Sequence, residues 1–153
     1  MTSRSRLGGL AAALAAGAVL AGCGSSGPSK ADFVKKADAL CAQVNRVHPP
    51  KPQPKNPKEA AAQQAEEVTI RRGLDTQLKA LDVPGNSKSD FDLYNAGTQK
   101  IIAAIGRMRL DAHNNNQKQY NADSKVFEQA AAEREKSAIK LGFKTCGRKN
   151  PAQ

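Results

Sequence analysis

The side chains best suited to chemistry in this chain are three cysteines, Cys23, Cys41 and Cys146, together with two histidines. A thiolate can attack a carbon electrophile, join another sulfur or bind zinc, and a neutral imidazole can bind a metal or transfer a proton. A zinc cluster would need a second cysteine two to four residues from the first, or histidines spaced to complete it. Neither pattern occurs, so the spacing predicts no metal site and leaves the cysteines for covalent chemistry.

The two histidines, His48 and His113, stand where structural roles are expected. His48 precedes a proline pair, and His113 falls at the end of a predicted helix, where the helix dipole favours a cation. A carboxylate-bridged di-iron bundle needs Glu three residues before each His, and Asn45 and Leu110 occupy those positions. The chain also lacks a Gly-x-Ser-x-Gly elbow, a glycine-rich phosphate loop and a His-Glu-x-x-His pair. We therefore predict no enzymatic activity, no catalytic residue and no cofactor.

The first 22 residues have the three parts of a secretory signal. Arg4 and Arg6 form a basic start, residues 7–20 are an unbroken run of Leu, Ala, Gly and Val, and small residues precede Cys23. The run is short for a membrane span, which needs about 20 strongly apolar residues, so a retained signal anchor is the less favoured alternative. The sequence Leu20-Ala21-Gly22-Cys23 resembles the lipobox of bacterial lipoproteins.

This resemblance implies that residues 1–22 are removed and that Cys23 becomes the acylated first residue. Cys23 would carry a diacylglycerol on its sulfur, and two or more acyl chains, such as palmitate, anchor a protein stably where one chain is marginal. The resemblance therefore implies a lipid-anchored protein on the extracytoplasmic face of the cell membrane. Residues 23–28, which include Gly24-Ser25-Ser26-Gly27-Pro28, would form a short flexible tether.

With Cys23 assigned to lipid, Cys41 and Cys146 remain as an even pair. In an exported chain such a pair is expected to form a disulfide, with two inert buried thiols as the alternative. The bond would close a loop of about 105 residues, for which the chain-entropy model gives about 4 to 5 kcal/mol of stabilisation. The sequences Ala37-Asp38-Ala39-Leu40-Cys41 and Thr145-Cys146-Gly147 also resemble uncharacterised small exported helical proteins of actinobacteria.

Residues 29–147 are predicted to form one helical domain. Apolar residues recur at helical spacing over four segments, 29–48, 56–82, 87–113 and 117–141, and no segment alternates like a strand. Ser29, Asn56 and Ser87 are expected to cap helices, and Gly142 to end the last one, after which Phe143 folds back. The apolar stripe of the first segment comprises Phe33, Val34, Ala37, Leu40, Cys41, Val44 and Val47. The proline-rich residues 49–55 predict an extended linker, or alternatively a docking peptide.

Short connections between these segments favour an all-α, up-down-up-down four-helix bundle, with the first and last helices adjacent. In that arrangement the fourth helix ends near the start of the first, whereas Cys41 lies about 18 Å along the first helix. Either the chain after Gly142 runs back along the bundle, or the helices are staggered. The remaining residues, 148–153, are expected to form a frayed basic tail.

The charge of the chain is its other distinctive feature. Lys and Arg total 24 against 14 acidic residues, a formal charge of +10, and the signal takes two basic residues and no acidic one, leaving +8. The export signal and the small number of aromatics, six, disfavour nucleic acid. We expect a non-catalytic module that contacts a partner in the cell envelope, either a protein or an anionic polymer. Candidate contacts are Lys51, Lys55, Lys58, Lys144, Arg148 and Lys149. The alternative is a small-ligand or lipid carrier with a cavity between the helices.

Overall fold

A computed structural model describes residues 27–147 of the chain. The predicted signal peptide 1–22, the lipid attachment site Cys23 and the basic tail 148–153 lie outside these residues. Within the described part the secondary structure consists of helices, with no strand. The predicted all-α fold class is therefore confirmed.

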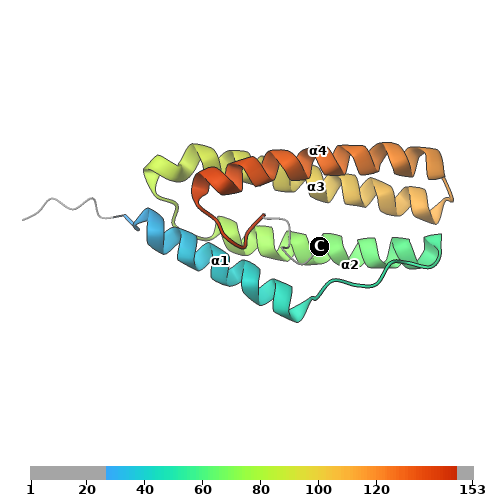
Figure 1. Cartoon of the computed structure of the whole chain (residues 1–153), viewed down its shortest axis with the longest axis horizontal. Coiled ribbons are helices and arrows are strands. Elements are labelled where there is room, and N and C mark those ends of the chain that lie inside the picture. The colour runs from blue at the N-terminus through green and yellow to red at the C-terminus, as the bar shows by residue number, and fades with distance from the viewer. Residues whose placement is uncertain (1–26, 148–153) are drawn as a thin grey trace, which may run out of the picture.

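Four long helices run up, down, up and down in chain order (Figure 1). Their bounds are α1 Lys30–Val47, α2 Pro57–Lys79, α3 Lys88–His113 and α4 Gln117–Leu141, and a short 3-10 helix, η1 Gly85–Ser87, precedes α3. The long linker between α1 and α2 is extended and crosses to the far end of the molecule before α2 begins (Figure 1). The predicted up-down-up-down bundle is thus confirmed.

Side chains fix most helix ends where the sequence placed them. The Ser29 hydroxyl accepts a hydrogen bond from the Asp32 N–H, and Asn56 does the same for the N–H of Glu59. Gly142 adopts a left-handed conformation with φ of 90°, which costs glycine little, and ends α4. The N–H of Phe143 then donates to the Ala138 carbonyl at 2.9 Å, the reverse turn expected after such a stop.

One predicted helix boundary was wrong, and one predicted cap lacks its side-chain hydrogen bond. Ser87 makes no side-chain capping bond, because η1 leads directly into α3 and holds Ser87 in a helical conformation. α2 ends at Lys79 rather than near Asp82, since the N–H of Leu81 bonds to the Leu78 carbonyl in a tighter turn. Neither difference changes the order or direction of the helices.

The main core lies at the end of the bundle where α1 packs. Four of the six aromatic residues meet there: Phe33, Phe91, Tyr94 and Phe143. The Phe33 and Phe91 rings stand edge to face with centroids 5.2 Å apart, and Tyr94 and Phe143 do so at 5.3 Å. Such pairs add stabilisation beyond the area they bury, so this cluster holds α1, α3 and the chain after α4 together.

The other half of the bundle is a three-helix structure. Its smaller core of Ile101, Ile105 and Ala130 comes from α3 and α4, and Val68 of α2 packs against it. α1 diverges from its neighbours toward its C-terminal end (Figure 1). Val47, predicted to face the core, therefore keeps 63% of its surface exposed. The apolar stripe on α1 packs into the core as far as Cys41. Beyond that residue α1 has too few neighbours to bury its apolar side chains.

Candidate functional site

The disulfide between Cys41 and Cys146 is present, with Cα atoms 5.3 Å apart. Of the two routes left open by the sequence, the chain after Gly142 takes the first and runs back along α1 (Figure 1). This returning segment is short, because Cys146, which bonds to Cys41, lies four positions after Gly142. Cys146 is fully buried and Cys41 nearly so, which marks the bond as structural.

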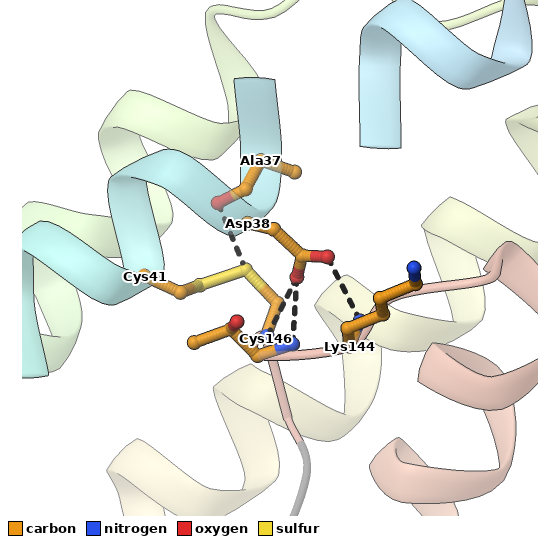
Figure 2. Close-up of a disulfide and its surroundings, with 6 residues drawn as sticks. Ala37, Asp38, Cys41, Lys144 and Cys146 are labelled. Atoms are coloured by element: carbon orange, nitrogen blue, oxygen red, sulfur yellow. Dashed lines mark hydrogen bonds between the residues drawn. A yellow bond between two sulfur atoms is a disulfide. The ribbon is translucent and has the colours of Figure 1, made fainter. Parts of the chain in front are cut away.

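Asp38 secures the same segment through its carboxylate (Figure 2). It accepts hydrogen bonds from three successive backbone N–H groups, those of Lys144, Thr145 and Cys146, at 2.8 to 3.0 Å. These donors would otherwise lack partners, because the segment belongs to no helix or sheet. Sequence analysis did not single out Asp38. The available signal was its position three residues before Cys41, on the same side of the helix.

The candidate basic residues do not gather into one patch. Lys51 forms an ion pair with Glu66 of α2, and Lys55 and Lys58 are exposed on the same stretch of chain. Lys55 lies beside Asn116, at the start of α4, whereas Lys144 follows the end of that helix. A helix of 25 residues is about 37 Å long, so Lys144 is far from the other three. Arg148 and Lys149 lie outside the described residues.

A groove of about 510 Å³ opens where α1 leaves the bundle. One wall is the end of α1 and the proline-rich linker, the floor is α2, and Tyr120 of α4 closes one end. The linker is fastened to α2 by the Lys51–Glu66 pair and by Gln63, whose amide donates to the Pro52 carbonyl at 3.2 Å. These two contacts connect the linker to α2 beside the groove, whose volume falls within the range of small-molecule sites.

The groove combines an apolar base with charged groups. Val44, Ile70 and Leu74 line it and are each partly buried. The hydrogen bond from Lys51 lowers the pKa of Glu66 below its ordinary value, so this carboxyl is ionised at neutral pH. Arg71 also lines the groove, with its side chain 24% exposed and its Nη2 atom 2.6 Å from Glu67.

A second arginine, Arg134, lies on α4. Its guanidinium stands over the Tyr94 ring, 5.8 Å from the centroid. Burial lowers the pKa of Arg134, and the positive charge of Arg71 acts in the same direction. Burial also raises the pKa of Tyr94. The backbone of Gly147 approaches the same two side chains so closely that a Cβ atom there would lie 2.9 Å from Tyr94.

A second polar cluster joins α3 and α4 near their connecting turn. Arg107 donates to the buried Asp123 carboxylate at 2.7 Å, and this bond lowers the pKa of Asp123. Burial raises the pKa of the neighbouring Asp111, and the charge of Asp123 adds to that rise. Asp111 also lines a smaller hollow of about 290 Å³ beside residues 54–57. The two carboxyls thus titrate in opposite directions from their ordinary values.

The histidines take separate positions. His48 lines the groove at the end of α1, and His113 is exposed in the last turn of α3. Between residues 27 and 147 no group of three or more His, Cys, Asp or Glu side chains is arranged to hold a metal ion. None of the helices in the same residues is both long and apolar enough to cross a membrane. Comparison of the chain with protein-family models, curated proteins and solved structures finds no match.

Proposed function

We propose that this protein is a membrane-anchored lipoprotein on the extracytoplasmic face of the cell, attached through acyl chains on Cys23. The lipobox-like sequence Leu20-Ala21-Gly22-Cys23 carries this proposal. The buried Cys41–Cys146 disulfide supports it, because such bonds form and persist in oxidising compartments outside the cytoplasm. The tether from Cys23 to Pro28 spans at most about 20 Å when fully extended, which would hold the start of α1 close to the membrane.

Substitution of the acylated residue tests the anchor directly. The Cys23→Ala chain should appear in the soluble fraction, and the parent should remain with membranes. Intact mass of the parent under non-reducing conditions should match a chain beginning at Cys23 plus acyl groups. Unchanged membrane retention of Cys23→Ala would refute the lipid anchor and would favour a retained signal anchor.

We further propose that the anchored domain is a non-catalytic module that contacts an envelope partner, a protein or an anionic polymer. Lys55 and Lys58 support this role, because both are exposed where the linker meets the start of α2, whereas Lys51 is paired with Glu66. The mature charge of +8 would also attract anionic material. Each such lysine near a charged surface contributes about 1 kcal/mol.

Binding to isolated envelope material tests this role. Lys55 and Lys58 would be changed together to Gln, and Lys35 and Lys36 would be changed to Gln as a control. Both variants lose two positive charges, and the control lysines are exposed on α1. Weaker, less salt-sensitive binding of the first variant alone supports the proposal. Equal weakening of both variants would mean that net charge, not this surface, attracts the material.

The groove favours a second function, a carrier of a small ligand. Its volume of about 510 Å³ falls within the range of known ligand sites. It is lined by the end of α1, the linker and α2, and Gln63 of α2 donates a hydrogen bond to the Pro52 carbonyl of the linker. Native mass measurement of protein extracted gently from its own cells tests this function, because a retained ligand adds mass that disappears on denaturation.

A further inference from the structure

The part of the chain that the structure describes ends at a half-buried position. Cys146 is fully buried, and Gly147 after it is partly buried. A Cβ atom on Gly147 would lie 2.9 Å from the Tyr94 ring and 3.3 Å from the Ala138 side chain. The φ of Gly147 is 69°, a left-handed conformation that glycine adopts at little cost. Residues 148–153 therefore continue from a point beside α3 and α4 that is packed against neighbouring side chains.

This point lies close to one end of the groove beside the linker. Cys146 is bonded to Cys41, and their Cα atoms are 5.3 Å apart. Val44, which lines the groove, follows Cys41 by three residues of α1, a rise of about 4.5 Å. Leu74 of α2 also lines the groove, and it packs against the buried cluster that contains Cys146. The described chain thus ends next to the part of the groove that Val44 and Leu74 form.

The remaining chain and the groove are similar in length. α2 lines the groove from Leu74 back to Ala60, and this stretch of helix is about 21 Å long. Residues 148–153 span at most about 20 Å when fully extended. A segment that leaves Gly147 toward Ala60 can therefore follow the groove for most of its length.

The apolar part of the groove suits such a segment. Val44, Ile70 and Leu74 are each only partly buried within residues 27–147. The segment contains Pro151 and Ala152, which can remove apolar surface from water on contact with these residues. Pro151 also favours an extended conformation in the residue before it, and it has no N–H group that would need a partner.

We propose that residues 148–153 lie in the groove and cover Ile70 and Leu74, so that the end of the chain closes its own groove. The covalent link to Gly147 gives the segment an effective concentration on the order of millimolar, so contacts too weak for a free peptide can hold it there. A ligand of the groove would have to displace this segment. The contact itself needs no ligand, so the inference is independent of the carrier function.

NMR of the mature chain, residues 23–153 with Cys23→Ala and the disulfide intact, tests this contact. Backbone order parameters of Asn150 and Ala152 should be about 0.85, as in rigid backbone, and values below about 0.6 would overturn the proposal. Nuclear Overhauser effects should connect Pro151 or Ala152 to the methyl groups of Ile70 or Leu74. A rigid segment without these effects would lie elsewhere, and the proposal would then be wrong.

Removal of residues 148–153 measures the cover directly. A neutral gadolinium chelate in solution should relax the methyl protons of Ile70 and Leu74 faster in the shortened chain than in the mature chain. Ile139 and Leu110 are internal controls, because they are exposed on α4 and α3 and do not line the groove. Their relaxation should be the same in both chains. An unchanged rate at Ile70 and Leu74 would overturn the proposal.

A matched pair of substitutions places the contact in the groove. Ile70→Gln should lower the order parameters of Asn150 and Ala152 below about 0.6, and Ile139→Gln should leave them near about 0.85. Circular dichroism should show the same helical content in both variants. Equal order parameters in the two variants would contradict the proposal. The carrier function would not be affected by that result, because native mass measurement tests it separately.

Discussion

Replacing Cys41 and Cys146 together by alanine should lower the free energy of unfolding by about 4.7 kcal/mol. The disulfide joins residues 105 positions apart, and closing a loop of that length restricts the unfolded chain by about this amount. The folded state should change less, because the Asp38 carboxylate still accepts hydrogen bonds from the three N–H groups of the returning segment. For a domain of about 120 residues the midpoint of thermal unfolding should fall by about 19 °C.

Guanidinium unfolding followed by far-UV circular dichroism measures this difference, with the oxidised parent and the parent in reductant as references. The slope of the free energy against denaturant should rise in the variant, because its unfolded state is more expanded. The reduced parent and the variant should agree to within about 1 kcal/mol. A loss smaller than about 1 kcal/mol with an unchanged slope would refute the reasoning, since restriction of the unfolded chain would then contribute nothing.

Three further substitutions test other contacts. Asp38→Ala should lower the unfolding free energy of the oxidised chain by about 2 kcal/mol in denaturant, because three backbone donors lose a charged acceptor. The control, Asp92→Ala at an exposed position, should lower it by less than about 0.5 kcal/mol. Equal losses would contradict the role of Asp38. Gly97→Ala should destabilise by about 1 to 3 kcal/mol, because its Cβ would lie 2.9 Å from Arg134 Cβ. Gly106→Ala, in the same helix with open space around it, should stabilise by about 0.4 to 1 kcal/mol in the same assay, and a loss in both would contradict the close approach of α3 and α4 at Gly97. Arg107→Gln should destabilise the protein at neutral pH and lose its effect in acid. The pKa of Asp123 is lowered in the folded state, so its ionised form stabilises the fold above the unfolded pKa of about 3.9, and this stabilisation is lost as the pH falls through the folded pKa. A difference in unfolding free energy that stays constant from pH 7 to pH 2 would show that Asp123 is not the group involved.

The local features of the fold were predictable because single side chains determine them. Ser29 and Asn56 cap helices through their own oxygens, and Gly142 ends α4 because glycine tolerates a positive φ. The Cys41–Cys146 pairing followed from counting cysteines in a chain whose first 22 residues resemble an export signal. Ser87 stands at the N-cap position of α3 but makes no capping hydrogen bond, because the 3-10 turn Gly85–Ser87 already holds it in a helical conformation.

The candidate site was not predictable, because it depends on the angle between elements. The stripe on α1 indicates which face is apolar and does not indicate how far the neighbouring helices extend along it. Val44 and Val47 were therefore predicted to be buried in the same way as Phe33 and Cys41. In the structure Phe33 and Cys41 are buried, whereas Val44 is only partly buried and Val47 is exposed. The groove exists only because α1 diverges from its neighbours toward its C-terminal end (Figure 1).

The disulfide also determines how the domain would respond to mechanical load. A pull between Ser29 and Gly147 passes along α1 to Cys41, across the sulfur atoms to Cys146 and out again, so α2, α3 and α4 carry none of the tension. The oxidised domain can lengthen only to about 50 Å, whereas the same stretch without the bond could extend to about 400 Å. A pull applied at Ser29 would thus unwind the first part of α1 and then stop at a covalent link.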